Sequence, residues 1–462
     1  MCIRDSDIIV DGVRAQGDVS LAAADDVRPA TPEGIRRLEG ANLTIFANNI
    51  NNDGFNGAFL YTDVDSITTR IERGGQLFIN EQSDVEANLL TQSGPISLQT
   101  NGNITGNASI TLPGNDITLI ARGDGSDISV DSVVVLGSND NVRLFAEDDI
   151  TATVQAGNLL AQALNGVDDQ NVSLRLNTTV RTLNVNAGLI SDPGSNRGDI
   201  IVNESNPLVL TRAVAANGRI IVAANGNIST GNVQSNGIST GNAIEISANG
   251  LGSDLSTSRV VVRDGTGGVL LSADDDIVEA NVNDRLAVVA DRVTYEAGNN
   301  TIDGFNGVIG HSYADTISVN LSSTAEAGAF LFNTGNTIVA DTVISNGQFS
   351  LTNRSGSARI DDITILSQQL NNRVFVNTSG IGGDVLVGNI DAGINGIVTI
   401  DSADDVLDTD LLDDLFISGQ LLNVTARNNS IDSFDGIILN IDVDNFSDLL
   451  SNGGETFVRR QS

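Results

Sequence analysis

Hydrophobic and polar residues alternate along most of this chain in short stretches that share one formula. A glycine or asparagine opens each stretch, aliphatic residues follow at every second position, and a small residue and a polar turn close it. Examples are GDVSLAAADDV (17–27), GPISLQTNGNI (94–104), GRIIVAANGNI (218–228) and GGVLLSADDDI (267–277). Neighbouring stretches typically begin about 18–25 residues apart. Alternation with a period of two predicts strands with one buried face. No stretch shows sustained helical periodicity.

A longer repeat of about 125 residues contains these short stretches. Three segments align without a gap, LTIFANNINNDGFNG (43–57), VTYEAGNNTIDGFNG (293–307) and LNVTARNNSIDSFDG (422–436). A second marker recurs as GQLFIN (75–80), GDIIVN (198–203), GAFLFN (328–333) and GETFVR (454–459). The predicted repeat units are therefore 7–27 (partial), 28–150, 151–277, 278–406 and 407–462 (partial).

Two all-β architectures agree with short strands at near-constant spacing. The favoured one is a right-handed parallel β-helix, in which residues 7–462 form one continuous solenoid with about 20–21 residues per coil. Its strands lie about 4.8 Å apart, so aliphatic side chains stack inside and Asn or Asp side chains form ladders in the turns. The alternative is a row of tandem β-sandwich domains. Sandwiches commonly have large aromatic core residues, whereas this chain has no Trp and 3 Tyr.

The two ends of the chain differ from its repeats. Residues 1–6, MCIRDS, contain the only Met and the only Cys. Back-translated, they match a transposase adaptor used in sequencing, so we interpret them as a sequencing scar. The last repeat breaks off soon after GETFVR. Both features predict an internal fragment of a longer protein.

Charge excludes several classes of partner. All 24 basic residues are arginine, 59 residues are acidic, and the formal net charge is −35. A surface this acidic repels phosphate backbones and anionic lipid headgroups, so we expect no nucleic-acid binding. No apolar run is long enough to span a bilayer, so we expect no membrane insertion of this segment.

The recurring formula G-x-[IV]-x-[LV]-x-A-x-x-D-[IV] resembles the haemagglutinin-type repeats of filamentous haemagglutinin-like adhesins. It is found in GDVSLAAADDV and GGVLLSADDDI, and the resemblance covers residues 7–462. These adhesins are long bacterial surface proteins with β-helical shafts, exported by two-partner secretion or as autotransporters. The resemblance implies an extracellular location at the bacterial cell surface and an outer-membrane transporter as a partner during export. The secretion domain of that family is absent here.

Two Arg-Gly-Asp triplets are candidate binding motifs, because this tripeptide can engage integrins from an exposed loop. They are Arg122-Gly123-Asp124 and Arg197-Gly198-Asp199. Gly-Asp also belongs to the turn formula, so an arginine before it arises easily by chance. The triplet at 122–124, in ARGDGSD, is the better loop candidate because Gly198 opens a predicted strand.

Paired aspartates recur before the closing aliphatic residue of a stretch, and a catalytic pair is one interpretation of them. They are Asp25, Asp26, Asp148, Asp149, Asp274, Asp275, Asp404 and Asp405. A catalytic pair is needed once per active site, and it also needs burial to raise one pKa. Four copies at strand ends instead predict a turn device in which the aspartates cap their own backbone amides.

Calcium is the one inorganic ligand that the composition favours. Clusters of aspartate have two interpretations, weak calcium binding or an acidic surface exposed to solvent without a bound ion. The candidate ligands, which supply hard oxygen atoms, are Asp63, Asp65, Asp442, Asp444 and Asp448. Neither the EF-hand spacing nor the GGxGxD nonapeptide is present, so no metal site is assigned. The only histidine, His311 in HSYAD, lacks the surroundings of a catalytic nucleophile and is expected at the surface.

Three hypotheses for function follow. The first is a non-catalytic structural shaft or binding surface of a secreted bacterial adhesin, which contacts glycans or proteins of a host or neighbouring cell. Its variable stretch 27–40, with three arginines, is a candidate contact loop. The second is a β-helical polysaccharide lyase or hydrolase, which needs a unique cluster of carboxylates with Arg or His in a groove. The third is a calcium-rigidified tandem β-sandwich spacer. We expect no enzyme and no cofactor beyond weakly bound calcium.

Overall fold

The computed structural model describes residues 7–30, 37–50, 56–164, 173–188, 198–236, 241–263, 266–281, 287–298, 305–323, 326–409, 416–430 and 434–460. All of the regular elements in these residues are strands. The described part of the chain therefore holds no helix that is long and apolar enough to cross a membrane. The chain divides into two compact units, Met1–Ala223 and Ala224–Ser462.

The first unit contains β1 (Ile8–Val10), β2 (Val13–Arg14), β3 (Val19–Ala23), β4 (Val27–Pro29), β5 (Leu38–Ala47), β6 (Gly57–Ile71), β7 (Gln76–Glu81), β8 (Val85–Thr91), β9 (Ile96–Thr100), β10 (Ile104–Ile110), β11 (Ile117–Ala121), β12 (Ile128–Val135), β13 (Asn141–Ala146), β14 (Ile150–Ala163), β15 (Leu174–Ala187), β16 (Ile200–Glu204) and β17 (Leu208–Ala215). Strand β18 (Ile220–Asn225) includes the point of division.

The second unit contains β19 (Ile228–Ser235), β20 (Asn242–Asn249), β21 (Leu255–Thr257), β22 (Arg259–Val262), β23 (Gly268–Ala273), β24 (Ile277–Glu279), β25 (Val288–Val289), β26 (Arg292–Ala297), β27 (Gly307–Tyr313), β28 (Thr316–Leu321), β29 (Ala327–Asn333), β30 (Thr337–Val339), β31 (Thr342–Ile344), β32 (Gly347–Asn353), β33 (Ala358–Ile365), β34 (Arg373–Thr378), β35 (Val385–Asp391), β36 (Ile397–Ser402), β37 (Val406–Asp408), β38 (Ile417–Ala426), β39 (Gly436–Leu450) and β40 (Glu455–Arg460).

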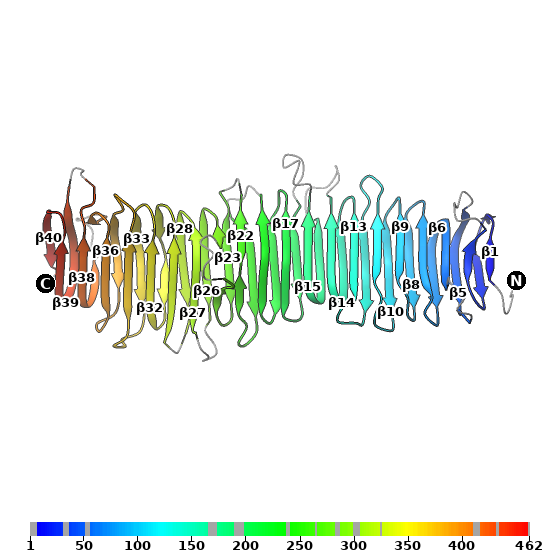
Figure 1. Cartoon of the computed structure of the whole chain (residues 1–462), viewed down its shortest axis with the longest axis horizontal. Helices are drawn as coiled ribbons and strands as arrows, with labels where there is room; N and C mark the ends of the chain where they lie inside the picture. The colour runs from blue at the N-terminus through cyan, green and yellow to red at the C-terminus, as the bar shows by residue number, and fades with distance from the viewer. Residues whose placement is uncertain are drawn as a thin grey trace. The chain divides into compact units, whose positions relative to one another are not determined.

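Parallel pairing sorts the strands of each unit into two stacks. In the first unit, one stack includes β7, β9, β11 and β13, and the other includes β8, β10 and β12. In the second unit, one stack includes β27, β29, β32, β34 and β36, and the other includes β26, β28, β33 and β35. Neighbouring strands of a stack lie side by side (Figure 1).

A chain that feeds successive strands alternately into two parallel stacks is a solenoid. The predicted fold class is thereby confirmed, and the structure is an all-β parallel solenoid of about 16 turns. The alternative of tandem β-sandwiches requires antiparallel hairpins. It is wrong, because the registers of both units are parallel.

Aliphatic ladders fill the space inside the coils. Leu77, Ile96, Ile117 and Val142 lie in register on consecutive strands of one stack, and each is at most 1% exposed. Burying one such side chain stabilises the fold by about 1.5–3 kcal/mol. The alternation seen in the sequence thus places every second residue in this core, as predicted.

Coil length is the number of residues between register partners. It is 19 from Leu77 to Ile96 and 21 from Ile96 to Ile117, which is close to the predicted 20–21. It rises to 24 from Ile150 to Leu174 and to 31 from Val27 to Ala58. The strands keep their parallel register across the 24-residue step.

Register also corrects the sequence alignment of one repeat marker. At the same place in three of the repeats, a glycine lies in register with a residue near the start of the next strand. The pairs are Gly57 with Gln76, Gly307 with Gly328, and Gly436 with Glu455. Gln76 and Glu455 are the second residues of the markers GQLFIN and GETFVR, whereas Gly328 is the first residue of GAFLFN. The sequence alignment, which starts these markers at 75, 454 and 328, is therefore wrong by one residue at GAFLFN. This stretch is apolar on both faces, so its period-two pattern does not specify a register.

Candidate binding surface

The triplet at 122–124 lies in the turn between β11 and β12. Arg122 and Asp124 are exposed, so the turn presents both charged side chains to solvent. The fold itself requires a glycine at position 123, because a Cβ there would lie 2.0 Å from the carbonyl oxygen of Asn101. The glycine is thus required by close backbone packing whether or not the triplet binds a ligand.

A shallow hollow of about 300 Å³ adjoins this turn. Ile120, Phe145 and Gln162 line it from three consecutive strands, where they lie in register. Arg122 and Glu147 lie at its polar edge. The hollow therefore combines an aromatic ring, an amide and two opposite charges on the outer face of a stack.

The second triplet is less suited to binding. Arg197 lies outside the described residues. Gly198 is buried, and the carboxylate of Asp199 forms an ion pair with Arg219 at 3.0 Å and accepts the backbone N–H of Arg219 at 2.7 Å. Asp199 is therefore engaged within the solenoid.

The five calcium candidates lie at the surface in two separate places. Asp63 and Asp65 lie on β6, where Asp63 accepts a hydrogen bond from the Ser83 hydroxyl at 3.1 Å. Asp442, Asp444 and Asp448 are exposed on β39. Within the described ranges, no three His, Cys, Asp or Glu side chains are grouped so that they could hold a metal ion. The structure does not assemble either candidate set into a coordination site.

The paired aspartates act between coils. In three of the four pairs, the aspartate next to the closing aliphatic residue accepts a backbone N–H bond from a glycine 31 residues later: Asp26 from Gly57 at 2.7 Å, Asp276 from Gly307 at 2.6 Å, and Asp405 from Gly436 at 2.7 Å. In these bonds, a link to the next coil takes the place of the expected cap of the aspartate's own turn. In ADDDI the pair equivalent to Asp25 and Asp26 is Asp275 and Asp276, not the predicted Asp274 and Asp275.

His311 is buried, and its predicted surface position is wrong. It is 4% exposed, because Phe332 stacks on the imidazole with 4.4 Å between ring centroids and an interplanar angle of 9°. Ser312 points to the other side of the strand and donates to Asn333 Oδ1 at 2.9 Å. Neighbours in sequence on a strand face opposite ways, so His311 and Ser312 do not form a catalytic pair.

Glu279, His311 and Arg354 form a chain of polar contacts. His311 Nδ1 lies 2.5 Å from Glu279 Oε2, and His311 Nε2 lies 3.2 Å from Arg354 Nη2. A guanidinium only donates, so Nε2 accepts and the ring proton is on Nδ1. Tyr295 is buried close by, and burial first, then the charge of Glu279, raises the pKa of its phenol. Glu279, His311 and Tyr295 are buried, Arg354 is half-buried, and together they link successive coils.

Two further buried carboxylates accept backbone hydrogen bonds. Glu81 accepts from the N–H groups of Gln82 at 2.7 Å and Val64 at 3.2 Å. Glu204 accepts from the Thr178 hydroxyl at 2.7 Å and from Val180 N–H at 3.0 Å. Burial raises the pKa of both carboxyls and outweighs these hydrogen bonds, which lower it. Both residues follow the second repeat marker, but the sequence pattern gave no sign that they would be buried.

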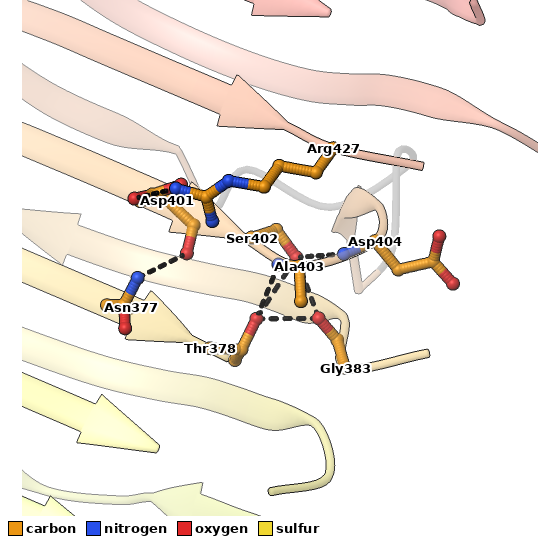
Figure 2. Close-up of polar contacts among 8 residues, drawn as sticks. All are labelled: Asn377, Thr378, Gly383, Asp401, Ser402, Ala403, Asp404 and Arg427. Carbon is orange, nitrogen blue, oxygen red and sulfur yellow. Dashed lines mark hydrogen bonds and ion pairs between the residues drawn. The ribbon is translucent and has the colours of Figure 1, made fainter. Parts of the chain in front are cut away.

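Hydroxyl groups close one corner of the second unit (Figure 2). Thr378 Oγ1 donates to the carbonyl of Gly383 at 2.6 Å and accepts from Ala403 N–H at 3.0 Å, while Ser402 Oγ donates to the same carbonyl at 2.9 Å. On the outer side of the same strands, Asn377 donates to the backbone carbonyl of Asp401 at 3.2 Å, and Arg427 pairs with the Asp401 carboxylate at 2.7 Å. The inward groups are fully used by the fold, whereas the outward ones line a surface.

That surface, which we call the aromatic face, is formed by β27, β29, β32, β34, β36 and the end of β38. One ladder of outward residues in register is Ile309, Phe330, Ser350, Phe375, Thr399 and Asn423. The parallel ladder is His311, Phe332, Thr352, Asn377, Asp401 and Thr425. Apart from the enclosed His311, these side chains are half-buried, so part of each is open to solvent.

The sequence analysis missed this surface, although its signal is present. Phe, Ser, Thr and Asn occupy the positions between buried aliphatic residues in GAFLFN, GQFSLTN and RVFVNT. Which of these residues share a ladder depends on register, which the sequence did not specify. Of the candidate contact loop 27–40, residues 31–36 lie outside the described residues.

No protein-family model, curated protein or solved structure matches this chain.

Proposed function

We propose that this chain is the structural shaft and binding surface of a secreted bacterial cell-surface adhesin, and that it is not an enzyme. The observation that carries the proposal is a difference in role: the repeated carboxylates bind the backbone of the solenoid, whereas the outward side chains of the strands are left to contact a partner. Repeated aspartates and buried glutamates are hydrogen-bonded to backbone groups of the same or neighbouring coils. Outward side chains form long ladders in register, which suit contact with an extended partner.

The fold supports this function through its mechanics. Successive coils are joined by rows of backbone hydrogen bonds and by side-chain links such as Asp276 to Gly307. Each coil contacts only its neighbours, so length can be added without changing the core. The haemagglutinin-type formula supports the same assignment, and with it an extracellular location and export through an outer-membrane transporter.

Adhesion of coated beads tests the proposal. Beads that carry residues 7–462 and beads that carry an unrelated protein of similar net charge would flow over epithelial cells and over bacterial lawns. We expect the coated beads to be retained under shear well above the control. Retention equal to the control on every surface would contradict the adhesin proposal.

A parallel assay addresses the enzyme alternative. The same chain would be incubated with pectin, alginate and hyaluronan, and new reducing ends and unsaturated sugar products would be measured. We expect no release above that of heat-denatured protein. Sustained turnover of any of these polymers would overturn the non-catalytic assignment.

A further inference from the structure

The aromatic face of the second unit has a chemical character unlike the chain as a whole. The chain has a formal net charge of −35, yet along the two ladders the only carboxylate is that of Asp401. Its side chain is 24% exposed and is neutralised by Arg427 at 2.7 Å (Figure 2). In the first unit the corresponding ladders include Arg143, which pairs with Asp116 at 3.2 Å, and they also carry rings such as Phe78 and Phe145. Along its two ladders the aromatic face is therefore nearly neutral, although the chain as a whole is strongly acidic.

One ring on this face is open between short neighbours. Phe375 lies in register with Ser350 on one side and Thr399 on the other, and all three side chains are half-buried. Strands in a sheet lie about 4.8 Å apart, and neither Ser350 nor Thr399 is large enough to cover the whole ring. The ring of Phe332, in contrast, is covered by the guanidinium of Arg354, whose Cζ lies 5.4 Å from the ring centroid.

Polar groups flank the rings at the same spacing. Asn377 lies two residues after Phe375 on the same face, and Thr399 and Asn423 continue the first ladder on the next strands. Amides and hydroxyls both donate and accept hydrogen bonds, which matches the hydroxyl groups of a sugar. A pyranose ring also offers a C–H face that packs on an aromatic ring. The ladder thus repeats the two contacts that a sugar chain needs.

We propose that the aromatic face, centred on Phe375, binds a neutral polysaccharide that runs across successive strands; this rests on the proposed adhesin function and names its ligand class. The negative field of the chain disfavours polyanions and a second copy of this chain. A neutral glycan is not repelled by this field. Its repeated sugar rings meet repeated rows of rings, hydroxyls and amides.

Affinity measurements on matched variants test the proposal. Soluble β-glucan, mannan and galactan serve as neutral probes and hyaluronan as the charged one, with binding followed by titration calorimetry. We expect at least one neutral probe to bind and hyaluronan not to bind. Phe375→Ala should weaken the binding about tenfold, a loss typical of a central aromatic contact. Thr399→Asp, which places a charge beside the ring without touching the core, should weaken it as well.

Leu386→Ala is the matched control, since Leu386 is an outward, half-buried apolar residue of β35 in the other stack. It should bind like the parent chain, and thermal melting would verify that all variants fold. Equal binding by all four proteins, or bead adhesion without any binding of a neutral probe, would overturn the aromatic face and leave the adhesin function standing. Self-association that Phe375→Ala abolishes would show a contact between copies instead. Loss of bead adhesion by the parent chain would refute the function itself.

Discussion

Single residues hold neighbouring coils together chiefly through carboxylates that accept backbone hydrogen bonds. Glu81 does so by accepting from Val64 and Glu204 by accepting from Val180 in the first unit, and Asp276 and Asp405 do so in the second. Hydrogen bonds to a charged acceptor contribute about 1.5–3 kcal/mol each, but burial of the charge opposes them. The raised pKa values of Glu81 and Glu204 show that burial dominates at these two positions.

Glu81→Gln and Glu204→Gln test the consequence for pH dependence. A carboxyl whose pKa is raised on folding contributes stability that is fully present below its ordinary pKa of 4.5 and is lost as pH rises through the folded value. The parent chain should therefore lose part of its unfolding free energy as pH rises from 4 toward neutrality. Each variant should lose less of it.

Denaturant unfolding at a series of pH values measures this effect. Glu86→Gln, on the exposed side of β8, controls for the removal of one negative charge from an acidic chain. Identical pH profiles for Glu81→Gln and Glu86→Gln would show that burial of Glu81 has no energetic consequence.

Whole strands are positioned by a staircase of polar side chains that precede them. The residue before a strand accepts the backbone N–H of its counterpart one coil later: Asp84 from Asn103 at 2.7 Å, Asn103 from Asp127 at 2.8 Å, and Asp127 from Asp149 at 3.0 Å. Asp384 accepts from Asp405 in the same way at 3.2 Å. Asn and Asp ladders in turns were predicted from the sequence, and this staircase is their form in the structure.

Asp127→Ala removes one step of the staircase. The backbone N–H of Asp149 then loses its acceptor, which should cost about 1–3 kcal/mol of unfolding free energy. Asp127→Asn keeps a side-chain oxygen in place and should restore most of the loss. Urea unfolding midpoints measure both. An Asn variant as unstable as the Ala variant would mean that the charge, not the hydrogen bond, matters.

Gly57→Ala tests the close approach of successive strands. Gly57 has a φ of 133°, and a Cβ there would lie 1.9 Å from the carbonyl oxygen of Gln76. Relief of this clash must move the backbone of β6 or β7, so we expect a loss of about 1–3 kcal/mol. Gly17→Ala is the control, because nothing lies within 4 Å of its added Cβ. Equal urea midpoints for the two variants would contradict the prediction.

At the scale of the whole molecule, a charge of −35 is spread over a core made of aliphatic ladders. Like charges repel one another and destabilise the folded chain, and salt screens this repulsion. Because the repulsion is spread over the whole chain, we expect its screening to be general and not specific to calcium.

Thermal melting in different salts checks this expectation. The melting temperature should rise with sodium chloride, and millimolar calcium should raise it no more than millimolar magnesium at equal ionic strength. A large increase that is specific to calcium and is reversed by a chelator would show a dedicated calcium site. It would revive the candidates Asp63, Asp65, Asp442, Asp444 and Asp448.

The sequence alone determined the strand class and favoured the parallel solenoid over tandem sandwiches, because alternation with a period of two and short strands at similar spacing leave a readable pattern. It also singled out the aspartates before each strand and the turn at 122–124. Register, burial and side-chain contacts across coils were decided only by the tertiary structure. The burial of His311, Glu81 and Glu204 and the ladder through Phe375 all depend on partners 17 to 43 residues away. A pattern read along one strand carries no information about which residues stand beside it.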